Sequence, residues 1–147
     1  MIANMLSLYM VINSNKKFNI IFYEDDTGYS QIYDFLEKLR AKSKTDKDAR
    51  IQYRQIVLYI DLLSKNGLNL STEIIKHIEG NIWEMRPGKN RILYFYFRDN
   101  TFVLLHQFIK KTQKTPTREI NQAKNEIKNF LRKEGNKWKH GILIKSK

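Results

Sequence analysis

The spacing of apolar residues divides this chain into a helical first part and a strand-rich middle. Residues 30–41 carry apolar side chains three and four positions apart, which predicts an amphipathic helix with its first residue, a serine, as N-cap. A second stripe at the same spacing predicts a helix that begins at Asp46 or Asp48 and ends at an Asn-Gly pair, residues 66–67. The first part therefore contains two consecutive helices.

Strand-like runs follow between residues 82 and 109. Residues 82–86 alternate between apolar and polar side chains, whereas the run R-I-L-Y-F-Y-F at 91–97 is apolar almost throughout. A strand that is apolar on both faces is typical of the centre of a sheet, covered by a helix on at least one side. Turn-forming residues at 87–90 and an Asp-Asn pair at 99–100 delimit this run and lead into a third run at 101–109. We therefore predict a three-stranded antiparallel meander.

Weaker signals complete the order of elements. Residues 18–23 indicate a first strand, and a short segment at 73–78 precedes the meander. The pair Thr115-Pro116 predicts the start of a last helix, with the threonine as N-cap. An apolar stripe extends this helix to about Arg132, and Gly135 is expected to close it.

The order β-α-α-β-β-β-α predicts a single α+β domain. We expect a curved antiparallel sheet with two N-terminal helices and one C-terminal helix packed on it. Residues 18–132 form this domain in our prediction, with an N-terminal extension at 1–17 and a basic tail at 133–147.

Charge narrows the range of partners. The 147 residues carry a net charge of +12, with a pI near 9.8. Residues 106–147 hold twelve Lys or Arg and three Glu, a net charge of +9, so residues 1–105 contribute only +3. Such a distribution predicts an anionic partner, most often nucleic acid, although a solvated basic surface with a basic tail is the simpler alternative.

Composition also bears on location. The chain has no cysteine, which excludes disulfides and thiolate metal sites and is compatible with the cytoplasm. No stretch approaches the roughly 18 apolar residues of a membrane helix. No basic residue precedes the apolar stretch in residues 1–12, which argues against a secretory signal. We expect a cytoplasmic protein without a membrane partner.

Sequence motifs of common enzymes are missing. There is no Gly-rich phosphate loop, no H-E-x-x-H and no G-x-S-x-G. His77, His106 and His140 are too dispersed to predict a metal site, and we expect no cofactor. For His106, which lies among apolar neighbours in a strand, a core or sheet-face position is favoured over a catalytic role.

Polar residues that leave the predicted meander are the candidates for chemistry. They are Glu84, Arg86, Arg91, Lys110 and Lys111. Clustered cations stabilise negative charge that develops on a phosphate, so these positions suit phosphodiester cleavage. Because Glu84 and Arg86 alternate onto one face, a salt bridge would also account for both.

The same segments resemble a known family. The strings W-E-M-R, R-I-L-Y-F-Y-F and L-L-H-Q-F-I-K-K-T-Q-K-T-P are similar to the phage-derived branch of the RelE/HigB toxins. The most specific part is the ordered string F-I-K-K-T-Q-K-T-P, and the resemblance extends loosely from about Phe18 to Leu131. Members of this family are small basic ribonucleases that cut messenger RNA on the ribosome, each neutralised by an antitoxin.

The resemblance implies roles for the candidates. It places Arg91 at the catalytic arginine of the family and a basic residue near the scissile phosphate at Lys110 or Lys111. Glu84 is a candidate general base, and the RNA 2′-hydroxyl would attack its own phosphate without a metal. Several RelE-like enzymes use a Tyr or His near the C-terminal end for acid–base work, where this chain has K-K-T-Q-K-T-P. Candidate RNA contacts around the meander are Lys76, His77, Lys89 and Lys114.

Partners and alternatives follow from the same resemblance. It implies a type II toxin–antitoxin hetero-oligomer whose antitoxin is a helix-turn-helix protein, with messenger RNA on the ribosome as target. One alternative is a non-catalytic nucleic-acid-binding protein that uses the same basic face, and another is a structural or assembly protein of a phage. The apolar residues 5–12 are expected to pack on the first two helices or to join the partner interface, unless they form a leader.

Overall fold

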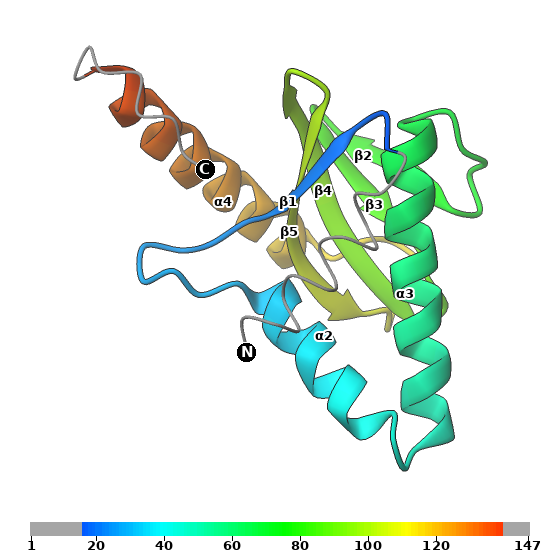
Figure 1. The fold of residues 1–147 in the computed structure, drawn as a ribbon. Coiled ribbons are helices and arrows are strands. Elements are labelled where there is room, and N and C mark those ends of the chain that lie inside the picture. The colour runs from blue at the N-terminus through cyan, green and yellow to red at the C-terminus, as the bar shows by residue number, and fades with distance from the viewer. Residues whose placement is uncertain (1–15, 140–147) are drawn as a thin grey trace.

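The computed structural model describes residues 16–139 and shows a five-stranded sheet with helices on both faces (Figure 1). The helices are α2 (Gln31–Lys42), α3 (Lys47–Asn66) and α4 (Thr117–Lys139). The strands are β1 (Asn19–Phe22), β2 (Ile75–Glu79), β3 (Ile82–Met85), β4 (Asn90–Arg98) and β5 (Thr101–Ile109). Helices α2 and α3 cover one face and α4 covers the other, which confirms the predicted α+β class and its placement of helices.

The sheet is mixed, with strand order β1-β5-β4-β3-β2. Strands β2 to β5 form an antiparallel meander of four strands, one more than predicted, because the short segment before residue 80 pairs with β3. Strand β1 runs parallel to β5 at one edge, so the prediction of a wholly antiparallel sheet was wrong. The long α2–α3 excursion after β1 makes this possible, since a parallel partner needs a long connection.

The two N-terminal helices begin and end where the sequence indicates. Ser30 and Asp46 are the N-caps, and each side chain accepts the backbone N–H three residues on, at 3.1 and 3.2 Å. Gly67 ends α3 with a φ of +58°, and a Cβ there would lie 2.7 Å from the ring of Phe18. A glycine is therefore required for both reasons.

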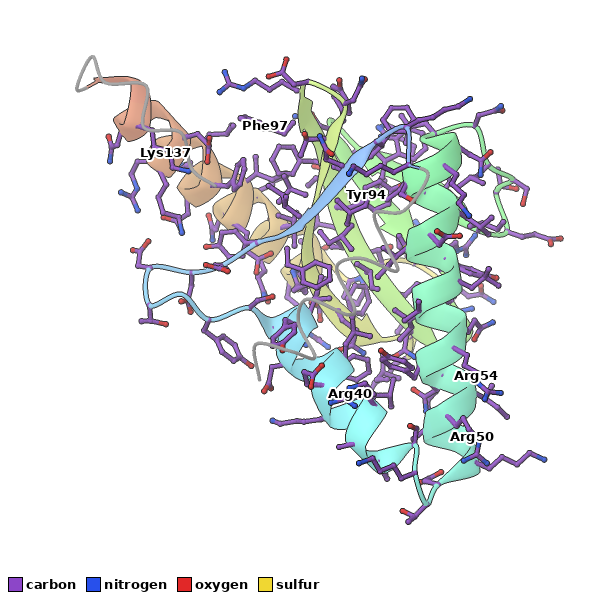
Figure 2. All side chains as sticks on the ribbon, viewed as in Figure 1. Arg40, Arg50, Arg54, Tyr94, Phe97 and Lys137 are labelled. Carbon is purple, nitrogen blue, oxygen red and sulfur yellow. The ribbon has the colours of Figure 1, made fainter. Side chains whose placement is uncertain are left out.

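The two faces of β4 enter two different cores. Tyr94 is fully buried under α2 and α3, whereas Phe97 lies on the α4 side against Phe130 (Figure 2). Tyr96 follows Tyr94 on the first face but is 41% exposed near the strand end. The predicted central strand, apolar on both faces, is confirmed. The hairpin after it turns at Asp99 and Asn100, both at positive φ as an Asp-Asn turn requires.

A β-bulge in β5 changes which residues face α4. Leu93 pairs with His106 but the next residue, Tyr94, pairs with Leu104, so Leu105 is the extra residue of β5. Leu105 packs in the α4 core and His106 contacts α4 as well, so two consecutive residues share one face. Simple alternation would have placed His106 with Leu104 under α2.

Helix α4 extends beyond its predicted end at Arg132 and includes Gly135. A glycine inside a helix costs only about 1 kcal/mol relative to alanine, which is too little to end it. The adjoining Glu134 and Lys137 form a 3.0 Å ion pair that supports this turn. The predicted helix end was therefore wrong.

None of the helices within residues 16–139 combines the length and apolar character needed to cross a bilayer. The apolar segment 5–12 and residues 140–147 of the predicted tail lie outside the described residues.

Candidate functional site

A hollow opens where the start of β4 and the end of β5 meet the loop that leads to α4. Its lining combines one carboxylate with four cations, one aromatic ring and small polar side chains. The lining residues are Glu84, Arg91, Phe108, Lys110, Lys111, Thr112, Gln113, Lys114, Thr115 and Pro116. The enclosed space is about 10 Å³, room for about one water molecule, so the hollow is a shallow depression and not a pocket that buries a small molecule. Its cations can contact an anionic ligand that lies across the surface.

Arg91 forms the inner wall of the hollow and is held before any ligand arrives. Its residue is 7% exposed, and its Nη1 donates to the carbonyls of Gly88 and Asn90, both at 2.8 Å. Within residues 16–139 its Nη2 makes no hydrogen bond. The pKa of Arg91 is lowered, because burial outweighs the opposite effect of the Glu84 charge. A guanidinium nevertheless stays protonated in proteins. The site thus contains a fixed positive charge with donors to spare.

Glu84 is the carboxylate behind that charge. It is 3% exposed on β3, and its Oε1 lies 3.8 Å from Nε of Arg91 and 3.7 Å from Nε of Arg86. The hydroxyl of Thr115 donates to its Oε2 at 2.6 Å. Both carboxylate oxygens are therefore engaged, and the group fixes Arg91 while fastening the loop before α4 to the sheet.

Arg86 contacts Glu84 but is not part of the lining of the hollow. It is half-buried, and its Nη1 donates to the carbonyl of Thr72 at 3.1 Å. Together with its contact to Glu84, this bond is the salt-bridge arrangement that the alternation of β3 indicated.

Three lysines form the outer wall of the hollow. Lys110 extends the β4–β5 ladder by one bond, from its N–H to the carbonyl of Lys89 at 2.8 Å. Lys111 and Lys114 follow on the loop, where the Thr112 hydroxyl donates to the Lys114 carbonyl at 2.6 Å. All three lysines are exposed, and none forms an ion pair with a carboxylate of the described chain. They are available to an anionic ligand.

The remaining predicted RNA contacts do not converge on the hollow. Lys76 is paired with Glu84 across β2 and β3, so it is exposed on the same face of the sheet as the hollow. His77 is paired with Trp83 and lies on the opposite face, with its Nε2 2.7 Å from the carbonyl of Gly80. Lys89 turns toward α3, where its Nζ lies 3.9 Å from Asp48.

Five lining residues were not among the candidates from the sequence: Phe108, Thr112, Gln113, Thr115 and Pro116. Phe108 is half-buried and directly opposite Arg91 in the β4–β5 register. Strand alternation from Lys110 could have indicated it. Thr115 was expected only to cap α4, and its bond to Glu84 joins residues 31 positions apart, which no local pattern signals.

His106 lies outside the hollow and holds α4 to the sheet. Its Nδ1 is 2.7 Å from Oε1 of Glu126 and its Nε2 is 2.9 Å from Oε1 of Glu119. Burial alone would lower the pKa of His106, but the hydrogen bonds and charges of both glutamates outweigh it and raise the pKa. Two carboxylate acceptors call for an imidazolium with both N–H groups donating. The preference for a sheet-face histidine is confirmed.

A protein-family model matches most of this chain. Residues 34–128 match the family described as phage-derived protein Gp49-like (DUF891). The chain belongs to this family. The match includes every lining residue of the hollow, and the Gp49-like family is a RelE-like family of toxin–antitoxin toxins. A search of curated proteins found no match to the chain.

Proposed function

We propose that this Gp49-like protein is the toxin of a type II toxin–antitoxin system and cuts messenger RNA on the ribosome. The observation that carries the proposal is the convergence of Arg91, Lys110, Lys111 and Lys114 on one open hollow. Four cations around a hollow of this size match a phosphodiester backbone, whose charge is the dominant attraction for a basic protein.

The chemistry that suits these groups is transesterification within the RNA. The 2′-oxygen forms a bond to the adjacent phosphorus, and the bond from phosphorus to the 5′-oxygen of the next nucleotide breaks. The proton of the 2′-hydroxyl goes to a base, and another proton reaches the departing 5′-oxygen. The products are a 2′,3′-cyclic phosphate and a 5′-hydroxyl, so no water is consumed.

The side chains of the hollow act on the negative charge of this reaction. The preorganised guanidinium of Arg91 and the lysine ammonium groups stabilise the dianionic phosphorane, which is where fixed cations lower a barrier most. Glu84 is the only carboxylate that the described part of the chain contributes to the lining, and both of its oxygens are engaged, so positioning Arg91 is its first task. We therefore place the larger share of proton transfer on ordered solvent and on the ribosome, which also orients the message.

An antitoxin would complete the system. A protein with this charge is neutralised most simply by an acidic segment that occupies the hollow. We expect that partner to be a helix-turn-helix protein, as the family resemblance implies.

A second candidate function is binding without cleavage. Among the described residues that line the hollow there is no His and no Tyr, although His is the side chain that most often transfers protons in catalysis. A non-catalytic relative would use the same basic surface to hold RNA or the ribosome.

The experiment that separates these functions replaces one nucleotide. A message programmed in the ribosomal A site should be cut by the purified protein, and a 2′-deoxy nucleotide at the cut position should abolish that cut alone. With free RNA, slow cutting should continue in EDTA. Cleavage that survives the deoxy substitution would contradict 2′-hydroxyl attack, and binding without any cut would favour the second candidate.

A further inference from the structure

A chain of side-chain amides runs beneath the hollow, on the opposite face of the sheet. Nε2 of Gln31 donates to Oε1 of Gln107 at 3.1 Å, and Nε2 of Gln107 donates to Oδ1 of Asn90 at 2.8 Å. Nδ2 of Asn90 then donates to Oε1 of Gln52 at 3.0 Å, and Nε2 of Gln52 donates to Asp48 at 2.6 Å. This amide chain links α2, β5, β4 and α3, and all of its bonds donate in the same direction, from Gln31 toward Asp48.

The direction of the chain strengthens each bond in it. Every amide oxygen accepts and every amide nitrogen donates, so the dipoles align and point toward the carboxylate of Asp48. Hydrogen bonds in such a series polarise one another. The ends of the chain are anchored on the two N-terminal helices, whereas its middle lies in the sheet.

Stability alone does not account for these amides. Asn90 is 1% exposed and Gln107 is 8% exposed, and burying a polar group gains little even when it is hydrogen-bonded. The neighbouring position on this face of β4 holds a buried isoleucine, Ile92. An apolar pair would therefore fill the same space, and the amides add geometric specificity instead.

Gln31 acts on β5 as a missing strand would. Strand β1 pairs with β5 only as far as Leu104, so within residues 16–139 no neighbouring strand pairs with the backbone of Gln107 on that side. Oε1 of Gln31 accepts the N–H of Gln107 at 2.7 Å, and its Nε2 donates to the carbonyl of Gln107 at 3.1 Å. The Gln31 side chain thus satisfies both the N–H and the carbonyl of Gln107.

These contacts lie just beyond the bulge at Leu105. A shift of one residue there would exchange the faces of every following side chain in β5, including Phe108 and Lys110. Gln107 would then no longer reach Asn90. The amide chain thereby favours the register in which Phe108 faces Arg91.

The other end of the connection is Asn90 itself. Its carbonyl accepts from Nη1 of Arg91 at 2.8 Å, and its N–H donates to the carbonyl of Pro87 at 3.0 Å. The side chain of Asn90 is thus tied to Gln107 while its backbone holds the guanidinium.

We infer that Gln107 and Asn90 are positioning residues, which set the spacing between Arg91 and the lysines at the end of β5. This inference rests on the proposed function for its kinetic consequences, but the position of Arg91 is measurable without it. Loss of the Gln107 amide should therefore misplace Arg91 and the lysines, although Gln107 itself would not touch the RNA.

The test uses Gln107→Met, which keeps the length of the side chain and removes the amide. In 15N-labelled protein, the Nε–H signal of Arg91, assigned by its loss in Arg91→Lys, should shift or broaden. In the ribosomal cleavage assay kcat should fall about 10- to 100-fold, as expected for a small misplacement of catalytic groups, with KM nearly unchanged. Gln122→Met is the matched control, since this exposed glutamine of α4 is not part of the amide chain. It should leave the Arg91 signal and kcat at wild-type values.

A second variant keeps the test decisive if Gln107→Met fails to fold. Gln31→Met removes the outer partner on α2, with its two bonds to the backbone of Gln107, and leaves the residues of β5 and β4 unchanged. It should move the Arg91 signal in the same direction. A lowered melting temperature with wild-type kcat and a wild-type Arg91 signal would overturn the inference and leave the amides a structural role. If the wild-type protein does not cut RNA, the proposed function fails, while the Arg91 signal still decides the positioning.

Discussion

At the scale of single residues, the defining feature is an arginine that is immobilised in the absence of any ligand. Two backbone carbonyls and a buried carboxylate hold the guanidinium of Arg91 at the edge of an open hollow. Fixed charge of this kind needs no reorganisation when a phosphate becomes more negative, which is why it lowers the barrier of that step. The same carboxylate, Glu84, binds Thr115 and so joins the arginine to the lysine-bearing loop.

Under the proposed function, Arg91→Ala should reduce cleavage by about 100-fold or more, because it would remove a cation that contacts the phosphate in the transition state. Growth of cells that express the variant and the cleavage rate on programmed ribosomes measure this loss. Arg98→Ala, at the opposite end of the same strand, is the control and should stay toxic. A folded Arg91→Ala protein with full toxicity would show that the assignment is wrong.

Lys110→Ala and Lys111→Ala should each lose less than Arg91→Ala, since the two exposed ammonium groups line one wall and can replace one another. The double variant should lose more than the product of the single losses. Single-turnover cleavage rates of the four proteins give the coupling between the two positions. Strictly multiplicative losses would mean that the lysines act independently.

At the scale of elements, α4 is held to the sheet by a buried charge as well as by its apolar stripe. His106 on β5 lies between Glu119 and Glu126, one turn and three turns into α4, and Arg118 lies 3.4 Å from Glu119. The bulge at Leu105 brings the imidazole to this face. Helix α4 follows directly on the lysine loop, so this contact also anchors one end of the hollow.

The raised pKa of His106 predicts how stability varies with pH. Because the folded pKa lies above the ordinary value of about 6.5, the stabilisation is complete below about pH 6.5 and is lost as pH rises through the folded pKa. Each unit of that rise is worth about 1.4 kcal/mol. Thermal unfolding between pH 6 and 9 should therefore show a decline that His106→Gln lacks and that His77→Gln retains. An NMR titration of His106 with a midpoint at or below the ordinary value would contradict this account.

At the scale of the whole molecule, the two faces of the sheet differ in the helices that cover them and in the charges that they carry. Helices α2 and α3 pack on one face of the sheet and α4 packs on the other (Figure 1). Arg91 of the hollow lies on the α4 side, two residues before Leu93 of the α4 core. On the outer side of α3, Arg50 and Arg54 point away from the sheet (Figure 2). Under the proposed function, the net charge of +12 would attract RNA from several directions, and the hollow would decide where a phosphate is held.

Binding of a non-cleavable single-stranded RNA should weaken steeply with salt. Each phosphate contact contributes a slope of about −0.7 in log K against log salt, so four cations give about −3. The Lys110→Ala, Lys111→Ala double variant should reduce the magnitude of the slope by about 1.4. A matched double variant, Lys65→Ala with Arg98→Ala, should leave the slope unchanged, and an equal reduction there would mean that binding is diffuse.

Local chemistry determined most of the elements of this fold from the sequence. The caps at Ser30 and Asp46, the glycine at residue 67 and the Asp-Asn turn each depend on a few adjacent residues, and the structure confirms all of them. The strings R-I-L-Y-F-Y-F and F-I-K-K-T-Q-K-T-P likewise indicated the RelE-like class and brought attention to Arg91, Lys110 and Lys111, which do share one hollow. Helix periodicity and turn propensity are short-range properties, so a single sequence contains them in full.

Long-range pairing decided the rest. The parallel partner of β1, the bulge at Leu105, the assignment of His77 to the far face and the bond from Thr115 to Glu84 each join segments or set a register that no local pattern specifies. A shift of one residue in a strand exchanges its two faces but hardly changes the local strand propensity. The register is therefore fixed only by the packing of both cores together with the hydrogen bonds of the buried amides. For that reason the sequence determined which residues carry the charge of this protein, and the tertiary structure decided which of them face one another.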